Sequence, residues 1–368
     1  MFSKNIKIKN DLHTFISIAS ILVIIGVLFV YSASSVYALE QTGSAAYYLK
    51  KQLLGIILGC IAFVITRFIS LTFIQTCTPI AFFSSLALTA GTLIPSISRT
   101  IHGSSRWISL AGFSFQPSEI LKITFILYIA HFLAKKEHQT FNFKRSYLPF
   151  FTIIALVALL LLRQPDFGLT VTLASTALMM LFISHFPVMH LSITFFACIP
   201  ALAFLIIKQP YRLQRILTFL NPWKDPQGSG FQIIQSLIAI GSGNWWGSGI
   251  SHSKQKFFYL PMQHTDFIFS IIAEETGFIG ATILIILYLL FLYFGCKIAW
   301  QLKKSFSIYA ALGLTFLISL QALINIFVAT GLLPTKGIGL PFISYGNSSL
   351  LCTCAMIGLI ANMVDETY

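Results

Sequence analysis

Residues 259–275 read Tyr-Leu-Pro-Met-Gln-His-Thr-Asp-Phe-Ile-Phe-Ser-Ile-Ile-Ala-Glu-Glu. The stretch ends a long polar segment and continues without a break into an apolar run long enough for a helix. His264 and Asp266 are therefore predicted at the mouth of a membrane segment, with Glu274 and Glu275 deeper. Because an ionisable group inside a membrane is costly and usually has a function, the pattern indicates a catalytic edge between water and lipid.

Composition decides the class of protein around this stretch. Of the 368 residues, 56% are hydrophobic and 10% are charged, and the mean hydropathy is +0.83. A protein in water cannot bury that much apolar surface, so we expect an all-α integral membrane protein with one polytopic domain over residues 1–368. The net charge of +13 lies in short clusters between apolar runs, which favours membrane surfaces over nucleic acid. The six cysteines have neither zinc-site nor disulfide-framework spacing.

Ten apolar runs are candidate transmembrane helices, and this even number places both termini on one side. The runs at 148–162 and 168–184 are shorter than the roughly 20 residues that a span prefers. The first run resembles a signal peptide, but the later runs make an uncleaved first span the simpler interpretation. The ten runs are 14–30, 52–66, 73–94, 117–134, 148–162, 168–184, 188–207, 267–295, 306–331 and 342–364.

The distribution of basic residues predicts the orientation of the chain in the membrane. With a cytoplasmic N-terminus, the inner segments receive eleven Lys and Arg residues and the short outer loops receive six. This distribution follows the positive-inside rule, so we expect cytoplasmic termini and an outer Asp266. The inner residues are Lys4, Lys7, Lys9, Arg67, Lys135, Lys136, Lys144, Arg145, Lys297, Lys303 and Lys304, and the outer ones are Lys50, Lys51, Arg99, Arg106, Arg163 and Lys336.

A polar stripe opens the apolar run near residue 117. Pro117 suits the first turn of a helix, and Glu119 lies near the positive helix end. Gln116, Glu119 and Lys122 follow at intervals of three, so they share one face. Lys122 is a candidate cation for a negatively charged leaving group, and an internal ion pair with Glu119 is the alternative.

A large structured loop is expected at 208–266, between the seventh and eighth runs. Residues 211–220 suit a short helix on the membrane interface, with Arg212 and Arg215 directed toward lipid headgroups. A second, semi-apolar helix is expected near 231–240. Contact with lipid headgroups is the simpler role for the two arginines, and binding of a negatively charged leaving group is the alternative.

Two further outer segments are rich in glycine. Residues 241–249, Gly-Ser-Gly-Asn-Trp-Trp-Gly-Ser-Gly, follow no strand, so they are not a dinucleotide fingerprint and are expected to form a flexible aromatic loop. Trp223, Trp245 and Trp246 are either interfacial anchors or ligand contacts. Residues 334–349 combine prolines, glycines and hydroxyls, a backbone tolerated at membrane depth only beside protein or a water-filled cavity. They are expected to line the same cavity as Asp266.

Six motifs occur in order along the chain: Arg106-Trp-Ile-Ser-Leu, Gln116-Pro-Ser-Glu, Asn221-Pro-Trp, Gly230-Phe-Gln, Leu260-Pro with His264-Thr-Asp-Phe, and Leu340-Pro-Phe-Ile-Ser-Tyr-Gly. Together they resemble the SEDS family of cell-wall proteins, whose members are the FtsW and RodA types. The resemblance covers nearly the whole chain, and Pro334-Thr-Lys-Gly looks closer to the division (FtsW) branch. Two positions depart from the family pattern, Met262 in place of a glutamate and Asn347 in place of a glycine; neither changes Asp266.

The resemblance implies a peptidoglycan glycosyltransferase. Its substrate would be lipid II, polymerised at the outer face of the bacterial cytoplasmic membrane, at the division septum. A class B penicillin-binding transpeptidase and other divisome membrane proteins would be its partners. The family's catalytic aspartate matches Asp266.

Glycosyl transfer from a lipid pyrophosphate needs a base for the acceptor hydroxyl and positive charge for the leaving group. Asp266 is the candidate base, and capping of the following helix by Thr265 or Asp266 is the alternative. A divalent cation such as magnesium or manganese is a further candidate for the leaving group, although the sequence names no metal ligands. The candidate substrate-binding residues are Arg106, Glu119, Lys122, His264, Lys336 and Ser344.

Some polar residues have structural interpretations, and two other functions stay open. Glu274 and Glu275 would shape a polar cavity or pair with a basic neighbour, and Asp166 would be a turn residue. The alternative functions are a lipid II flippase or transporter and a non-catalytic division scaffold. The absence of a convincing internal repeat and the crowding of ionisable residues toward one side favour the enzyme, and a scaffold would not require Asp266.

Overall fold

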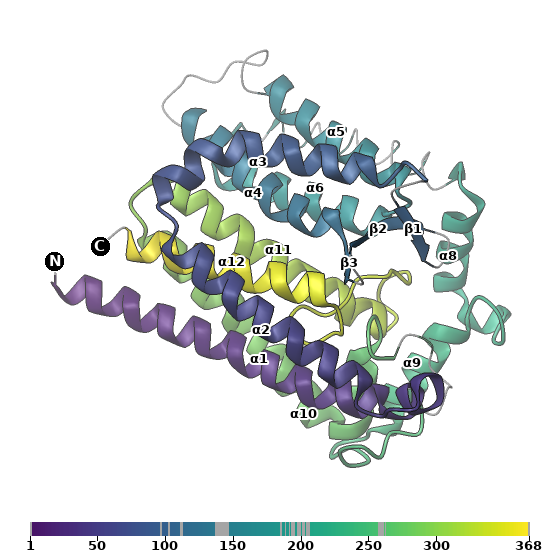
Figure 1. Cartoon of the computed structure of the whole chain (residues 1–368). Helices are drawn as coiled ribbons and strands as arrows, with labels where there is room; N and C mark the ends of the chain where they lie inside the picture. Colours follow the sequence, from purple (N-terminus) through teal and green to yellow (C-terminus); the bar gives the residue numbers. More distant parts are fainter. Residues whose placement is uncertain are drawn as a thin grey trace.

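Long apolar helices run side by side in the computed structural model (Figure 1). Among the residues that the structure describes, seven helices are long and apolar enough to cross a membrane: α1 (Phe2–Thr42), α2 (Tyr47–Phe68), α3 (Leu71–Gly91), α4 (Pro117–Lys136), α10 (Ile268–Gln301), α11 (Ser305–Ala329) and α12 (Asn347–Asp365). Two shorter apolar helices, α5 (Leu148–Arg163) and α6 (Phe167–Ile183), lie among them. The structure describes residues 2–366 except 96–97, 102–103, 111–112, 137–146, 185, 188, 191, 193–195, 197–199, 201–202, 204–206, 257–260 and 262.

Most of the predicted spans coincide with these helices. The exception is the run at 188–207, which falls largely outside the described residues, so the count of ten stays a prediction. Both termini lie at the same end of the bundle in Figure 1, as an even number of crossings requires. Which side of the membrane this end faces also stays a prediction.

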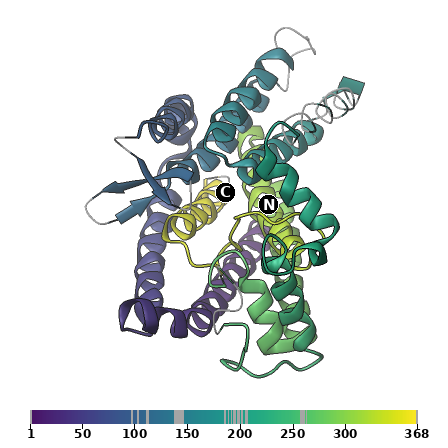
Figure 2. The ribbon, with the colours of Figure 1, turned by 90° about the vertical axis from the view of Figure 1, so that its right-hand side faces the viewer.

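The two last helices form the centre of the bundle. Most residues of α11 and α12 are buried, and Figure 2 shows α12 in the middle of the molecule when the bundle is viewed end on. Helix α11 packs against α4, α6 and α10, whereas α12 packs most extensively against α2. Helix α1 belongs to the same core, since Phe15 stacks on Phe291 of α10 with ring centroids 4.5 Å apart. The first apolar run is therefore an integral part of the fold.

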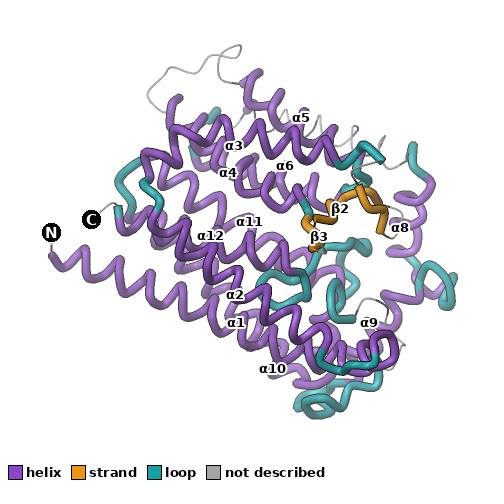
Figure 3. Tube along the Cα trace, viewed as in Figure 1, coloured by secondary structure: helices purple, strands orange, loops and turns teal. Residues whose placement is uncertain are grey.

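The end opposite the termini carries the short elements and most loops (Figure 3). They include α8 (Pro210–Leu220), the 3-10 turn η2 (Pro222–Lys224) and α9 (Phe231–Ser242), which are helices in the predicted outer loop. The expectation of an all-α protein holds for the bundle but misses a small antiparallel sheet. Its three strands, in the order β1-β2-β3, are β1 (Ser98–Ile101), β2 (Ser104–Leu110) and β3 (Phe113–Phe115). Alternating polar and apolar residues with Thr, Ile and Trp favour strands there.

Close packing between α1 and a distant loop provides a test of this fold. A Cβ atom at the buried Gly26 would lie 2.6 Å from the carbonyl oxygen of Phe342 and 2.8 Å from Cα of Ile343. Because backbone atoms cannot move aside as a side chain can, Gly26→Ala should destabilise the protein by about 1–3 kcal/mol, as other overpacked cores are. The expected result is a lower thermal transition in detergent.

The matched control is Gly91→Ala at the end of α3. A Cβ atom there meets no other atom within 4 Å, so this change should leave the transition unchanged or raise it slightly. Equal transition temperatures for the two variants would contradict the packing of α1 against residues 342–343.

Candidate active site

A cavity of about 310 Å³ lies at the loop-rich end of the bundle. Strand β2, the first turns of α4, α6 and α12, helix α11 and the segments 265–266 and 337–346 contribute to its wall. We call it the Asp266 cavity. The predicted neighbourhood of Asp266 and residues 334–349 is therefore present. Its polar lining residues include Arg106, Gln116, Glu119, Asp166, Asp266, Gln321 and Ser344.

Asp266 lies on the wall of this cavity, just before α10. The helix is capped by Phe267 without a side-chain hydrogen bond, so the alternative of capping by Thr265 or Asp266 is wrong. No lysine, arginine or histidine of the described residues lies within 4.0 Å of the Asp266 carboxylate. Burial raises the pKa of Asp266 to about 6, and Arg215 and Arg106 oppose this shift. The carboxylate is thus partly desolvated and available for proton transfer.

The backbone around Asp266 is held by a buried asparagine that the sequence analysis did not single out. The Nδ2 of Asn325, on α11, donates to the carbonyls of Asp266 and Ile338, both at 2.7 Å. One side chain therefore fixes the two segments that flank the cavity. An amide in the middle of an apolar run was the available signal, because such a group must find partners inside the protein.

Ser344 is a second fixed link between these segments. Its hydroxyl donates to the carbonyl of Thr265 at 2.6 Å and accepts from the N–H of Leu340 at 2.6 Å. The N–H of Tyr345 donates to the carbonyl of His264 at 3.0 Å. Ser344 thus lies on the cavity wall, as a substrate-binding residue would, but its hydroxyl is engaged in holding the wall together.

His264 lies behind the wall in a group of aromatic rings. Its ring is 4.5 Å from that of Tyr48, 5.7 Å from Tyr37 and 5.8 Å from Tyr345, centroid to centroid. Burial lowers the pKa of His264 to about 4, so the imidazole is neutral at pH 7. It does not line the cavity, and its position favours orientation of the Asp266 segment over direct substrate contact.

Arg106 lies between the Asp266 cavity and a second cavity. Its guanidinium donates to the carbonyls of Gln164 and Pro165 at 2.9 and 2.6 Å and lies 3.1 Å from the carboxylate of Asp166. Asp166 also caps α6 by accepting from the N–H of Leu169, as a turn residue would. The turn position of Asp166 follows from local sequence, whereas its ion pair with Arg106 does not, because the two residues are 60 positions apart.

Glu119 and Lys122 form the internal pair that was the alternative for Lys122. The ammonium and the carboxylate are 2.6 Å apart, and both side chains are buried. Glu119 reaches the Asp266 cavity, but Lys122 is enclosed behind it and does not line the cavity. The structure therefore shows the internal ion pair for Lys122, and direct contact of Lys122 with substrate stays a prediction.

The second cavity, of about 210 Å³, is lined by four cations: Arg106, Arg212, Arg215 and Lys336. We call it the basic cavity. It shares Arg106, Asp166 and Gly337 with the Asp266 cavity, so the two adjoin. Burial lowers the pKa of Lys336, while nearby Asp166 raises it. A concentration of positive charge beside a carboxylate base suits a phosphate-bearing substrate.

Helix α8 is turned the opposite way from the sequence prediction. The Nη1 of Arg215 donates to the carbonyl of Thr335 at 2.7 Å, and Arg212 lies 5.5 Å from the ring of Phe167. Both arginines therefore point toward the basic cavity, not toward lipid headgroups. The outward face of α8 carries Leu213, Leu217 and Leu220.

Other predicted residues lie outside these two cavities or outside the described chain. Glu274 and Glu275 are buried in α10; Glu275 accepts from the hydroxyl of Ser32 in α1, and Glu274 accepts from the N–H of Lys254 in a neighbouring loop. Met262 lies outside the described residues, and so do Lys144 and Arg145. Among the described residues, no group of three or more His, Cys, Asp and Glu side chains could hold a metal ion.

The sequence and the fold are similar to those of known cell-wall proteins. Residues 12–368 match the family model for FtsW, RodA and SpoVE, described as cell cycle proteins. The probable peptidoglycan glycosyltransferase FtsW of Trichlorobacter lovleyi is 40% identical over 338 residues, covering 92% of this chain and 89% of that protein. Stage V sporulation protein E of Bacillus subtilis is 38% identical over 346 residues, covering 94% of each.

A solved structure gives the same result for the fold. One chain from a study of the structural coordination of polymerization and crosslinking by a peptidoglycan synthase complex has a TM-score of 0.79 and 30% sequence identity. The similarity covers 96% of this chain and 98% of that chain. The resemblance inferred from the six motifs is therefore confirmed.

Ser344→Ala tests the link between the two cavity segments. The substitution removes the acceptor of the Leu340 N–H and the donor to the Thr265 carbonyl. Amide hydrogen exchange in residues 340–345 should become roughly fivefold to twelvefold faster, as expected for the loss of about 1–1.5 kcal/mol. Exchange measured by mass spectrometry in detergent checks this. Ser349→Ala, elsewhere on the wall, takes no part in these bonds and is the control; equal exchange in both variants would show that Ser344 does not hold the segment.

Proposed function

The chain belongs to the FtsW, RodA and SpoVE family and is a peptidoglycan glycosyltransferase, and we propose that it polymerises lipid II with Asp266 as the general base. The observation that carries this proposal is the state of the three acids in the Asp266 cavity. Glu119 is paired with Lys122 and Asp166 with Arg106, whereas Asp266 has no cation within 4.0 Å among the described residues. Asp266 is therefore the acid of this wall that is free to accept a proton.

The reaction places different demands on the two cavities. The acceptor hydroxyl attacks the anomeric carbon of the donor sugar and gives its proton to the Asp266 carboxylate. The bond between that carbon and the pyrophosphate oxygen breaks, and the electron pair leaves with the pyrophosphate. A raised pKa makes Asp266 a stronger base than an ordinary aspartate, provided that it is ionised.

The basic cavity supports the leaving-group half of this proposal. Arg106, Arg215 and Lys336 present positive charge beside the Asp266 cavity, where negative charge develops on the pyrophosphate. Because Arg106 borders both cavities, a donor held there would have its anomeric carbon close to the base. Both cavities lie at the end of the bundle, where the lipid tail can stay in the bilayer while the headgroup reaches the site.

The cellular setting extends the proposal. Relatives named FtsW and the match to a peptidoglycan synthase complex support a role in septal wall synthesis, in a multi-pass protein of the bacterial cytoplasmic membrane. Its partners would be a class B penicillin-binding transpeptidase, which would crosslink the new strands, and other divisome membrane proteins. With cytoplasmic termini, the cavities would face the outer side, where the glycan is assembled.

Asp266→Asn should abolish glycan polymerisation while leaving the protein folded. The amide keeps the size of the side chain but accepts no proton, and loss of a general base typically lowers the rate by about 10²–10⁴-fold. The measurement is strand formation from purified lipid II, with the transpeptidase partner present and inserted protein quantified.

Glu40→Gln is the matched control, because it removes an exposed acid near the same end of the bundle and should retain activity. Normal polymerisation by Asp266→Asn would refute the mechanism. Movement of labelled lipid II between leaflets by the reconstituted wild type, without polymer, would replace the enzyme with a transporter.

The pH dependence of the polymerisation rate should reflect the raised pKa of Asp266. Polymerisation should fall about tenfold per pH unit below about pH 6, because the protonated acid is no longer a base. An unshifted aspartate, with a pKa of 3.8, would place this fall about two units lower. Arg215→Gln removes a cation that lowers the pKa of Asp266, so its acid limb should move to higher pH. A limb near pH 4, or one that Arg215→Gln leaves in place, would contradict this assignment.

A further inference from the structure

Helix α10 is interrupted at Gly277, inside a segment predicted to cross the membrane. Gly277 has φ 69° and ψ −167°, which breaks the ladder of helical hydrogen bonds. Such a break frees carbonyls before it and N–H groups after it, and in lipid these groups must have protein partners. The segment 244–249 supplies them. Ser248 and Gly249 donate to the carbonyls of Glu274 and Glu275 at 2.9 and 3.1 Å, and Phe278 and Ile279 donate to the carbonyls of Asn244 and Trp245 at 2.8 and 3.3 Å.

Glycines allow this pairing of two backbones. A Cβ atom at Gly247 would overlap the backbone of Glu275, and one at Gly277 would overlap the backbone of Trp245. Both glycines also have positive φ, a conformation that other residues adopt at a cost. The glycine-rich sequence of 241–249 therefore serves close approach to α10.

The carboxylates of α10 hold the rest of the loop. Glu275 accepts from the hydroxyl of Ser32 at 2.6 and 2.8 Å and lies 3.7 Å from the ammonium of Lys256. Glu274 accepts from the N–H of Lys254 at 2.8 Å. The predicted alternative for these glutamates, pairing with a basic neighbour, is thus what the structure shows for Glu275. The loop 241–249, which was expected to be flexible, is fixed to α10 through its backbone, and the two acids hold residues 253–256 that follow it.

The fixed loop directs large apolar side chains outward. Trp245, Trp246 and Ile250 are 65%, 82% and 65% exposed, and Phe278, just after the break, is 59% exposed. The rings of Trp245 and Phe278 pack with centroids 5.2 Å apart. We call these four residues the tryptophan patch. The loop backbone is bonded to α10, so the loop does not fold over these side chains. An exposed apolar patch of this kind indicates contact with an apolar or interfacial environment.

The patch continues into an exposed apolar face of α10. Residues Phe278, Ile285, Leu289, Tyr293 and Trp300 are all exposed and recur at helical spacing. Phe278 and Trp300 are 22 residues apart, which is about 33 Å along a helix at 1.5 Å per residue. A bilayer's hydrocarbon core is about 30 Å thick, and aromatic residues concentrate at its two boundaries. The face therefore has an aromatic belt at each end, with the tryptophan patch forming the belt on the cavity side.

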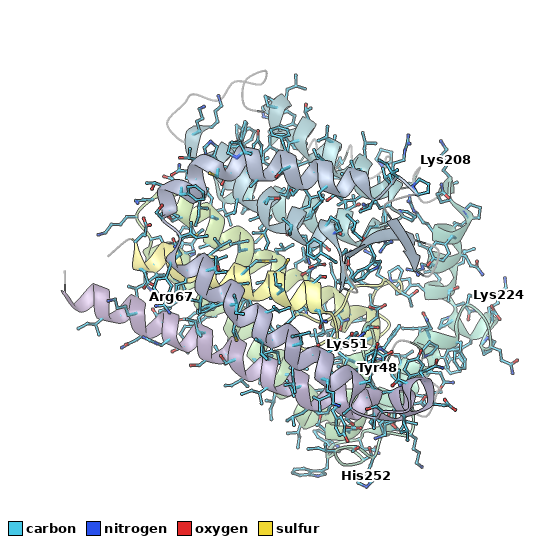
Figure 4. All side chains as sticks on the ribbon, in the orientation of Figure 1. Tyr48, Lys51, Arg67, Lys208, Lys224 and His252 are labelled. Carbon is cyan, nitrogen blue, oxygen red and sulfur yellow. The ribbon has the colours of Figure 1, made fainter. Side chains whose placement is uncertain are left out.

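We propose that the tryptophan patch binds the lipid interface of the leaflet on the cavity side and fixes the depth of α10 in the bilayer. Its position fits this occupant. Figure 4 places His252, in the same loop, beside the bundle, where the side of a membrane protein meets lipid, whereas Lys224 lies beyond the bundle's end. The break at Gly277 then falls at the membrane boundary, where the loop covers the free backbone groups and the tryptophans contact headgroups and upper acyl chains.

Tryptophan fluorescence in proteoliposomes tests this assignment. The reporter variant carries Trp107→Phe, Trp223→Phe and Trp300→Phe, so that only Trp245 and Trp246 emit among the five tryptophans. Phosphatidylcholine brominated near the headgroup should quench about half of this emission or more, because tryptophan settles at the interface. Phosphatidylcholine brominated near the chain terminus should quench it less, and aqueous iodide should have little effect.

A second reporter that keeps only Trp223 is the matched control. This residue is 62% exposed, stands next to Lys224 and should be quenched by iodide and not by brominated lipid. Emission of Trp245 and Trp246 that behaves like that of Trp223 would overturn the proposal and would assign the patch to a protein partner. Size-exclusion profiles in detergent confirm that both reporters are folded, and neither result depends on glycosyltransferase activity.

Discussion

The structure depends on one constraint: polar backbone enclosed within a membrane protein must find its partners inside the protein. The segments around Asp266 and Leu340 are irregular, so their backbone N–H and carbonyl groups do not pair within the segment as they would in a helix. Asn325 and Ser344 connect them, by binding carbonyls of both segments and the N–H of Leu340. The same bonds that remove the cost of an irregular backbone also set where the Asp266 carboxylate stands. The same hydrogen bonds therefore stabilise the cavity wall and position the Asp266 carboxylate.

Charge pairing then decides which polar residues can do chemistry. An ion pair that is buried is costly to break, because the remaining charge stays desolvated. Glu119 with Lys122 is such a pair, and Asp166 with Arg106 is a partly buried one, so these acids are poor proton acceptors in the ground state. Asp266 is partly desolvated without a close partner, which raises its pKa and leaves it reactive. Its role follows from how its neighbours are paired as much as from its own position.

The sequence predicted what depends on local pattern and missed what depends on pairing across the fold. Hydropathy located the described spans, and the boundary between polar and apolar residues at 264–267 located Asp266 at a helix mouth. Composition could not show that Arg212 and Arg215 point inward, because an amphipathic helix has two faces and only tertiary contacts choose between them. The partner of Arg106 lies 60 residues away, and Asn325 was one polar residue in a long apolar run. The strands at 98–115 were too short for their alternation to stand out.

Electrostatics also couples the two cavities. Arg215 and Arg106 lower the pKa of Asp266, and both arginines line the basic cavity. A pyrophosphate bound there would place negative charge against these cations and weaken their effect on the carboxyl. Donor binding would then raise the pKa and the basicity of Asp266, since less positive charge would stabilise the ionised carboxylate less. The gain has an upper limit, because a pKa above the working pH would leave the acid protonated and unable to accept the acceptor's proton. The cations therefore have to bind the donor firmly enough to stabilise its departure while still leaving Asp266 ionised.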